Sequence, residues 1–307
     1  MIRPLLVIVG PTAAGKTRIA IKLAEELNGE IISADSRQIY KGMDIGTAKP
    51  TIEEQARDRH YMLDVVNPDE HFSVGEYKRR VEAVIDDIWN RKKLPIIAGG
   101  TGLYIKAVID GLWEGPQADE KIRKGLEEEE KEKGRGYLYS KLKEADPETA
   151  ERTSPNDLVR IIRALEVYHI EGKPISHFHK ANAFEERNYN TIIIGLTRDR
   201  KMLYRLIEER VDEMIRSGLV DEVGSLLKKG YDEHINSMTA VGYKQILGYL
   251  KGRYDLSEAV RLIKRDTKRY AKRQYTWFNK DKRIEWHNVD DINTGALASD
   301  IKKRLKL

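Results

Sequence analysis

Residues 5–17 read LLVIVGPTAAGKT, an apolar run that leads into a glycine-rich turn. The turn fits the pattern G-x-x-x-x-G-K-[ST] of a phosphate-binding loop, in which backbone N–H groups surround an anion and the lysine adds a positive charge. Residues 18–27 continue with apolar residues at helical spacing. The stretch therefore predicts strand, loop and helix in the order that this motif requires. We interpret it as a P-loop, against the alternative of a tight turn with a purely structural role.

The alternation of strands and helices continues up to residue 116. Apolar segments predict further strands at residues 30–34, 61–66 and 94–98, and residues 74–89 predict an amphipathic helix. Strands that alternate with helices indicate a parallel sheet covered on both faces. The predicted fold class is α/β, a P-loop NTPase-like parallel sheet core with helices on both faces.

Two further regions complete the predicted organisation. Residues 117–190 carry only helical patterns, including a helix for which Ser154 is the expected cap, and are interpreted as an inserted all-helical domain. The remaining predictions are a strand at 190–196, helices at 201–217, 220–229, 241–250 and 257–279, and an edge strand at 284–289. The domains are then 1–116 with 191–307, forming the core and a helical C-terminal region, and 117–190.

Composition excludes several classes of protein. The 307 residues contain no cysteine, which rules out disulfides, thiolate metal sites and a cysteine nucleophile. The apolar run near the N-terminus, residues 5–9, is far shorter than the roughly 20 residues of a membrane span. We therefore expect a cytoplasmic protein that does not contact a membrane.

Positive charge is concentrated in the last fifth of the chain. Residues 251–307 hold 16 Lys and Arg against 8 Asp and Glu, and the preceding residues hold 39 against 42. This asymmetry indicates either a polyanionic partner such as a nucleic acid or a solvated helix face. Basic side chains at helical spacing in 261–283 predict phosphate contacts. Tyr270 and Trp277, seven residues apart in that helix, are expected in the core.

Two polar residues follow predicted strands at the edge where a parallel sheet binds ligands. Asp35 comes directly after the strand at 30–34, and could cap a helix, assist Mg²⁺ or accept a proton. Thr101 lies in the segment Gly-Gly-Thr-Gly at 99–102, where glycines let the backbone approach a ligand. A plain turn between strand and helix is the alternative for that segment.

The motifs together resemble the bacterial tRNA dimethylallyltransferase (tRNA isopentenyltransferase) family. Each segment alone is weakly specific, but their order along almost the whole chain is highly specific. The matching segments are GPTAAGKT at 10–17, SADSRQIYKGMDIGTAKP at 33–50, GGTGLY at 99–104, VRIIRALEVY at 159–168, AVGYKQ at 240–245 and YAKRQYTWF at 270–278.

The resemblance implies a reaction and its substrates. Such an enzyme transfers the dimethylallyl group from dimethylallyl diphosphate to N6 of the adenosine on the 3′ side of the anticodon in tRNA, with Mg²⁺ as cofactor. The anticodon stem-loop is the implied RNA partner, and we expect a monomer. The resemblance makes Asp35 the general base and Thr101 a contact at the reacting centre. It makes Thr17 the metal contact and assigns the diphosphate to Gly10, Pro11, Thr12, Ala13, Ala14, Gly15, Lys16, Thr17 and Arg210.

The resemblance also implies a set of tRNA contacts in four segments, together with Thr101 and Arg123. They are Asp35, Ser36, Arg37, Gln38, Thr101, Arg123, Val159, Arg160, Ile161, Ile162, Arg163, Ala240, Val241, Gly242, Tyr243, Lys244, Gln245, Arg273, Gln274, Tyr275, Thr276, Trp277, Phe278, Asn279 and Lys280. One departure from the family is Ala14, where many relatives have serine, so a hydroxyl contact is absent there.

Two other functions account for parts of the pattern. A P-loop small-molecule kinase would use Asp35 to activate a hydroxyl and residues 117–190 as a lid, but would leave the basic C-terminal helix without a role. A non-catalytic RNA-binding protein regulated by nucleotide would use that helix, but would leave Asp35 and Thr101 without one.

Overall fold

The computed structural model describes residues 3–111, 113, 115–181 and 189–307, which form two compact units. Unit 1 consists of residues 1–109 and 187–307, and unit 2 of residues 110–186. The limits expected from the sequence, 117 and 190, lie a few residues further along the chain. Each unit is described by itself.

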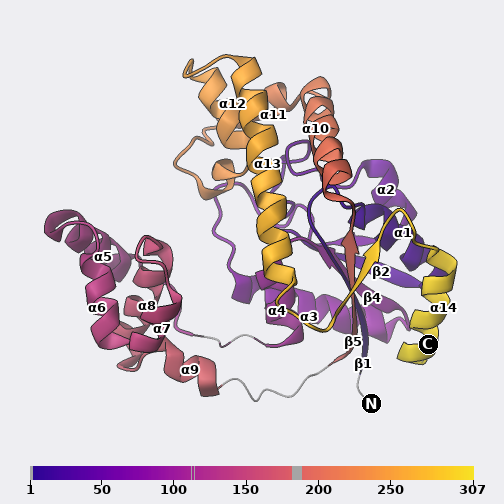
Figure 1. Ribbon diagram of the computed structural model, residues 1–307, viewed down its shortest axis with the longest axis horizontal. Coiled ribbons are helices and arrows are strands. Elements are labelled where there is room, and N and C mark those ends of the chain that lie inside the picture. The colour runs from indigo at the N-terminus through magenta and orange to yellow at the C-terminus, as the bar shows by residue number, and fades with distance from the viewer. Residues whose placement is uncertain (1–2, 112, 114, 182–188) are drawn as a thin grey trace. The chain divides into compact units, whose positions relative to one another are not determined.

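Unit 1 is built on a parallel sheet of six strands (Figure 1). The spatial order is β3-β2-β4-β1-β5-β6, so the strand that precedes the P-loop lies inside the sheet. The strands are β1 (Arg3–Val9), β2 (Gly29–Ala34), β3 (His60–Tyr61), β4 (Leu94–Gly99), β5 (Tyr189–Thr197) and β6 (Ile284–Asn288).

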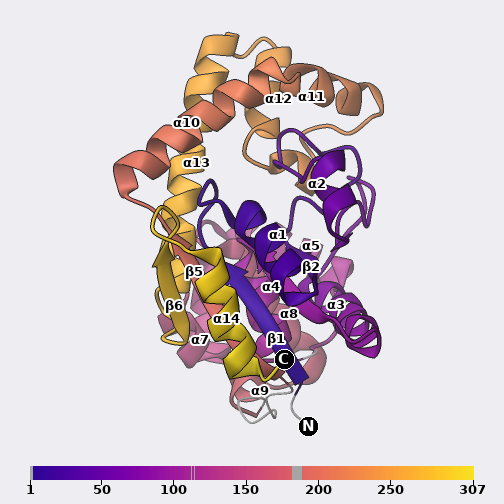
Figure 2. The ribbon, with the colours of Figure 1, turned by 90° about the vertical axis from the view of Figure 1, so that its right-hand side faces the viewer.

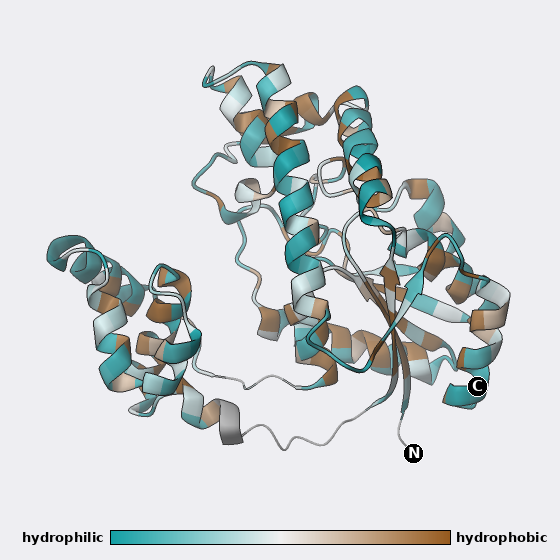
Figure 3. Cartoon of the chain, in the orientation of Figure 1, coloured by the Kyte–Doolittle hydropathy of each residue, from teal (hydrophilic) through white to brown (hydrophobic). Residues whose placement is uncertain are grey.

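Helices cover both faces of the sheet, which explains the uninterrupted apolar run in β1. The neighbouring residues Leu5 and Leu6 point to opposite faces, and both are fully buried. Figure 3 shows brown, hydrophobic residues along the strands in the middle of the sheet. Leu6 packs with helices α1 (Lys16–Leu27) and α14 (Thr294–Leu305), and Leu5 packs with α3 (Val74–Asn90) and α4 (Gly102–Ile109) (Figure 2).

The predicted strand at 61–66 is wrong beyond its first residue. Only His60 and Tyr61 pair with β2, and the chain then turns through Met62 and Asp64, which have φ of 64° and 53°. From there the backbone N–H of Val65 donates to the carbonyl of Ile39 at 2.7 Å. This segment therefore supports the loop after β2 instead of extending the sheet.

The carboxyl ends of four strands lie in one row. Val9 is in register with Gly99 and Gly195, and Ala34 is also in register with Gly99. Because the strands are parallel, the segments that follow them emerge at the same edge. The P-loop, Asp35 and Thr101 are thereby brought together from distant parts of the sequence.

Further helices of unit 1 form a second core beyond that edge. The largest fully buried side chain in it is Tyr243, and the buried Ile39 and Met43 of the loop after β2 join it. The elements are α10 (Arg200–Arg216), α11 (Leu219–Lys228), the 3₁₀ helix η2 (Asn236–Thr239), α12 (Tyr243–Leu250) and α13 (Leu256–Phe278), and the short α2 (Ile52–Arg57) follows the loop.

Unit 2 is all-helical with its own core, to which Leu138, Leu142 and Ile161 contribute. Its helices are α5 (Glu120–Lys133), α6 (Tyr137–Ala145), α7 (Pro147–Arg152), α8 (Leu158–Glu171) and α9 (Ile175–Ala181). The expected cap of α8 at Ser154 is wrong, because Asp157 caps this helix by accepting the N–H of Arg160. Ser154 instead accepts the N–H of Asn156, in a turn before the helix.

Within the described ranges, every helix is too short or too polar to cross a lipid bilayer.

Candidate functional site

The P-loop connects β1 directly to the N-terminus of α1. Its backbone includes Ala13 at φ 63°, a left-handed conformation that residues with a Cβ rarely adopt and that is concentrated at functional sites. Lys16 is the first residue of α1, and its Nζ donates to the carbonyl oxygen of Pro11 at 2.8 Å. A helix N-terminus with a lysine at this position favours an anionic ligand.

Two cations face this loop. Burial lowers the pKa of Lys16 to about 8, the nearby Asp35 opposes this effect, and Arg210 adds to it. Arg210 comes from α10, its pKa is lowered by burial, and its Nη1 lies 3.5 Å from Oγ1 of Thr12. Two desolvated positive charges next to N–H groups of a helix terminus create a strong local field for a phosphate.

Asp35 follows β2, and within the described part of the chain only one of its two carboxylate oxygens accepts hydrogen bonds. Oδ1 accepts the N–H of Arg37 at 2.8 Å and that of Gln38 at 3.4 Å. Oδ2 receives no hydrogen bond from the described part of the chain. Asp35 therefore caps its own turn, not a helix, and leaves one carboxylate oxygen available as an acceptor.

Thr101 lies between Asp35's segment and α13. Its Oγ1 accepts the N–H of Ser36 at 3.0 Å, and the hydroxyl of Tyr270 lies near its side chain. The backbone N–H of Thr101 donates to the carbonyl of Ala34 at 3.0 Å. The threonine thus joins the ends of β2 and β4 to α13.

Lys16, Arg210 and Asp35 line a cleft of about 650 Å³ in unit 1, whereas Thr101 is not among its lining residues. Its size suits a small diphosphate together with one nucleobase. Of the residues assigned to the diphosphate, those on its wall are Thr12, Ala13, Gly15, Lys16, Thr17 and Arg210. Asp35, Ser36, Arg37 and Gln38 are also on the wall, as are Tyr270, Arg273 and Gln274. Ala14 is fully buried, with its methyl group in the core.

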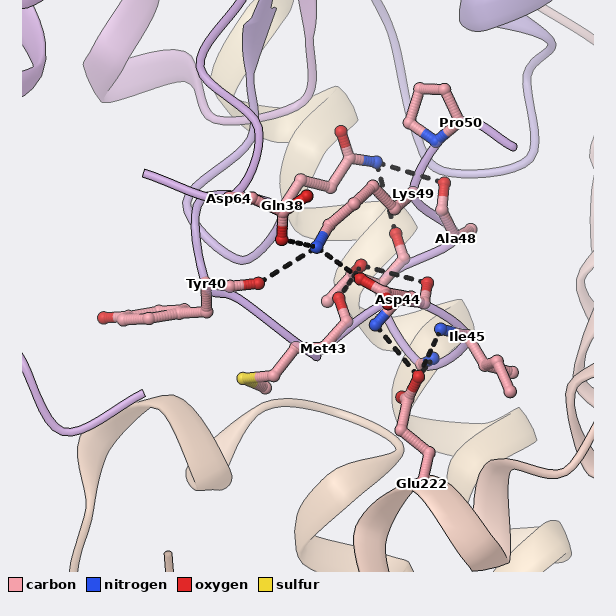
Figure 4. A network of polar contacts seen from close by, with 12 residues as sticks. Gln38, Tyr40, Met43, Asp44, Ile45, Ala48, Lys49, Pro50, Asp64 and Glu222 are labelled. Atoms are coloured by element: carbon pink, nitrogen blue, oxygen red, sulfur yellow. Dashed lines mark hydrogen bonds and ion pairs between the residues drawn. The ribbon is translucent and has the colours of Figure 1, made fainter. Parts of the chain in front are cut away.

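A polar network organises the loop after β2 and was not predicted from the sequence (Figure 4). Glu222 of α11 accepts the N–H groups of Asp44, Ile45 and Gly46, at 3.0, 2.8 and 3.2 Å. It also accepts the hydroxyl of Tyr243 at 2.6 Å. No local pattern marks Glu222, because its partners lie nearly 180 residues earlier in the chain.

Two further side chains complete this network. Lys49, only 3% exposed at its side chain, donates to the carbonyl of Tyr40 at 3.0 Å and pairs with Asp44 and Asp64. Gln38 accepts the hydroxyl of Ser33 and donates to the carbonyls of Thr47 and Ala48. The amide of Gln38 is thus already engaged within the protein.

Several tRNA contacts implied by the resemblance are buried in unit 1. In the segment 240–245, Tyr243 and Gln245 hydrogen-bond Glu222 and Asp266, and only Lys244 is exposed. Phe278 belongs to the core, and Tyr275 is half-buried beside Thr197, their hydroxyls 2.7 Å apart. The exposed members of the C-terminal segment are Arg273, Thr276, Trp277, Asn279 and Lys280.

In unit 2, most of the implied contacts also have internal roles. Ile161 and Ile162 are core residues, so their side chains are not available to contact RNA. Arg123 and Arg163 both bind the fully buried carboxylate of Glu166, at 2.8 and 2.7 Å. Val159 is 81% exposed, and Arg160 is exposed beside Asp157.

The basic helix α13 differs from its sequence interpretation in two respects. Lys264 and Lys268 are paired with Asp212 and Glu208 of α10, so they do not belong to a free phosphate-binding face. The expectation that Trp277 and Tyr270 lie in the core is wrong. Trp277 is 40% exposed, and Tyr270 lines the cleft, because this end of α13 crosses the open edge of the sheet.

A P-loop at the carboxyl edge of a parallel sheet, with cations and a carboxylate on one cleft, defines a protein that binds an oligophosphate. Comparison with known proteins narrows this class. The family model described as IPP transferase matches residues 38–281. The tRNA dimethylallyltransferase of Halothermothrix orenii is 50% identical over 301 residues, which cover 97% of this chain and 92% of that relative.

Solved structures agree with this match. The tRNA isopentenylpyrophosphate transferase of Bacillus halodurans is 40% identical, with a TM-score of 0.74 over 99% of this chain and 97% of that one. A eukaryotic dimethylallyltransferase acting on tRNA is 26% identical, with a TM-score of 0.82 over 97% and 78%. The chain belongs to the tRNA dimethylallyltransferase family. The expected fold class and the expectation of a prenyltransferase are thereby confirmed, and the kinase and the non-catalytic RNA-binding protein are set aside.

Proposed function

We propose that the protein transfers the dimethylallyl group from dimethylallyl diphosphate to N6 of the adenosine on the 3′ side of the anticodon of tRNA. The observation that carries the proposal is the single cleft on which Lys16, Arg210 and Asp35 meet. This arrangement supports a site for a diphosphate next to an acceptor for a proton. The names of the relatives supply the identity of the prenyl donor and of the RNA.

The chemistry requires both parts of this cleft. The bond between C1 of the dimethylallyl group and the diphosphate oxygen breaks, and a bond between C1 and N6 forms. The lone pair of N6 is delocalised into the adenine ring, so its proton becomes acidic only as the new bond forms, and Asp35 accepts it. Lys16, Arg210 and the loop N–H groups stabilise the charge on the departing diphosphate.

Mg²⁺ is the cofactor we propose for the diphosphate. Among the residues that the structure describes, no three His, Cys, Asp or Glu side chains gather into a site that could hold a metal alone. The hydroxyl of Thr17 on the cleft wall is an oxygen ligand of the kind that Mg²⁺ prefers, and the substrate's oxygens and water would supply the others. When bound, the ion would neutralise part of the diphosphate charge.

The RNA contacts we retain are the exposed ones and the half-buried Arg37 on the cleft wall. The exposed ones are Lys244, Arg273, Thr276, Trp277, Asn279 and Lys280 on unit 1, and Val159 and Arg160 on unit 2. The target base must leave its stack to reach a concave site, which costs a few kcal/mol more from a paired helix than from an open loop. That the protein works as a monomer in the cytoplasm stays a prediction from the sequence.

The deciding experiment supplies labelled dimethylallyl diphosphate with an unmodified anticodon stem-loop. We expect label in the RNA when the adenosine is in the hairpin loop, and none when the same sequence is in a full duplex. A parallel reaction with ATP should show no consumption, and Lys16→Ala serves as the variant with a disabled P-loop. Equal labelling of hairpin and duplex, or ATP turnover without labelling, would contradict the proposal.

A further inference from the structure

Helix α13 lies directly on the segment that carries Thr101. A Cβ added to Gly100 would lie 2.1 Å from Nε2 of Gln274, and one added to Gly102 would lie 2.0 Å from Nε1 of Trp277. Real Cβ atoms do not approach other atoms this closely, so a side chain at either position would force Gln274 or Trp277 to move away from the segment. The glycines on either side of Thr101 therefore serve contact with α13 as well as any approach of a ligand.

Gln274 uses both ends of its amide at this contact. Its Oε1 accepts the backbone N–H of Thr12 in the P-loop at 2.8 Å, and its Nε2 donates to the carbonyl of Gly100 at 3.0 Å. The side chain is 5% exposed, so these bonds are shielded from water. One residue thus connects the loop after β1 with the loop after β4.

The rest of α13 shows why this connection matters. One turn earlier, Tyr270 lies near the side chain of Thr101, and Arg273 is exposed at the cleft. On the other side of the helix, Lys272 and Thr276 are exposed. The same helix therefore presents polar and basic groups to a polyanion while it holds the phosphate loop and Thr101. A residue assigned by resemblance to tRNA contact faces the donor side instead.

We propose that Gln274 is a positioning residue for prenyl transfer, which fixes the distance between the P-loop and the Gly100–Gly102 segment. This inference rests on the proposed function and adds a role to it. A diphosphate held by the P-loop and a base beside Asp35 and Thr101 react only when both loops keep one spacing, since small misplacement of reacting groups slows reactions strongly. Gln274 supplies that spacing through its two hydrogen bonds.

The test compares Gln274→Met with the wild type. Methionine has a similar length and fills the space, but it provides neither hydrogen bond, each of which contributes modestly. We expect single-turnover transfer with both substrates saturating to slow by about tenfold or more, and pyrophosphate binding measured by calorimetry to weaken several-fold. The dissociation constant of the anticodon hairpin should change less than twofold.

Gln274→Glu tests the two hydrogen bonds of Gln274 separately. The carboxylate can still accept the N–H of Thr12, but it repels the carbonyl of Gly100 and adds a negative charge near the bound diphosphate. Pyrophosphate should therefore bind this variant more weakly than it binds Gln274→Met. The difference should shrink at high ionic strength, where charge repulsion is screened.

Two control variants make the outcomes distinct. Lys272→Ala, on the exposed side of α13, should weaken hairpin binding and leave pyrophosphate binding unchanged. Ile88→Val, in the core and not on the cleft wall, should lower the melting temperature slightly without changing either affinity. Weaker hairpin binding with normal pyrophosphate binding in Gln274→Met would show that Gln274 contacts RNA and would overturn the proposal.

A loss of thermal stability alone in Gln274→Met would also overturn it, since that would give Gln274 a purely structural role. If the wild type failed to transfer any prenyl group, the proposed function would be wrong. The pyrophosphate measurements would still report on the loop spacing in that case. The two failures can therefore be told apart.

Discussion

Lys16 donates a hydrogen bond from Nζ to the carbonyl oxygen of Pro11, 2.8 Å away within the same loop. Its pKa, lowered mainly by burial, is about 8. The ammonium therefore begins to lose its proton only slightly above neutral pH. Its charge and its place at the start of α1 make it the natural partner of a diphosphate.

The first prediction concerns the pH dependence of donor binding. Above pH 8 the free protein increasingly carries a neutral Lys16, so the affinity for pyrophosphate should fall as pH rises from 7 to 9.5. In Lys16→Arg the charge persists across this range, and the decline should be much shallower. Calorimetric titrations at a series of pH values test this, and identical pH profiles for the two proteins would exclude Lys16 as the titrating group.

The second prediction concerns Asp35→Asn. The amide oxygen can still accept the N–H groups of Arg37 and Gln38, so the turn should keep its shape, but the side chain can no longer accept a proton. Single-turnover transfer should slow by about 10²–10⁴-fold, with much smaller changes in the affinity for either substrate. A near-normal rate would mean that Asp35 only positions the adenosine.

The third prediction concerns Glu222→Gln. An amide at this position offers one oxygen and one NH₂ group, so it cannot accept all the hydrogen bonds that the carboxylate receives from residues 44–46 and Tyr243. We expect a loss of about 1–3 kcal/mol in the free energy of unfolding, because partly buried donors lose a partner. Hydrogen exchange of the N–H groups of residues 44–46 should accelerate. Tyr243→Phe, which removes only one of these bonds, should leave that exchange nearly unchanged.

The fourth prediction concerns the basic face of α13. Lys272 and Arg273 are exposed. Replacing either of them by alanine should reduce the slope of log affinity against log salt by roughly 0.7–0.9. Lys264 and Lys268 are already paired with carboxylates of α10, so their replacement should have a clearly smaller effect. Hairpin binding measured at several salt concentrations provides the slopes. The comparison uses two double mutants, one with Lys272 and Arg273 and one with Lys264 and Lys268 replaced by alanine. Equal slopes in the two would show that RNA competes successfully for the paired lysines.

The fifth prediction concerns the stability of unit 2 in acid. Burial tends to raise the pKa of Glu166, but hydrogen bonds from Arg123 and Arg163 outweigh it, and the net pKa is lowered. The stability that follows from a lowered carboxyl pKa is present above the unfolded value of 4.5 and is lost as pH falls through the folded value. Unit 2 of the wild type should therefore lose stability below about pH 4.5.

Glu166→Gln should remove much of that acid dependence. At neutral pH this substitution should destabilise unit 2 by about 2–3 kcal/mol. The loss is smaller than for a fully buried ion pair, because both arginines keep about a third of their side-chain surface exposed. Thermal unfolding between pH 3 and 7 tests both statements. An unchanged pH profile in the variant would place the acid sensitivity elsewhere.

Local patterns predicted the parts of the fold that depend on neighbours in sequence. The run at 5–17 predicted β1, the P-loop and α1 because each is encoded by apolar spacing and glycine placement within a few residues. The strand at 61–66 failed because positive φ at Met62 and Asp64 turns the chain, and an apolar pattern does not reveal that turn. Of the segment 159–163, helical spacing alone could have separated the buried Ile161 from the exposed Val159.

The candidate site was predictable only where a motif names its residues. Lys16 and Asp35 were found because they follow strands that meet at one edge of the sheet. Glu222 and Gln274 act on backbone groups 176 and 262 residues away in the chain, and no spacing in the sequence encodes such a contact. The role of such a carboxylate or amide can be recognised only once the fold shows which backbone groups lie next to it.

The hydrogen bond between Thr12 and Gln274 also has a consequence for the order in which the protein matures. The P-loop is synthesised 262 residues before the side chain that holds its backbone. Contacts of such long sequence separation form late and slow folding. A growing chain can assemble strands around β1 early, yet it completes its anion-binding loop only after Gln274 has been made, so chains that still lack Gln274 should not sequester the prenyl donor.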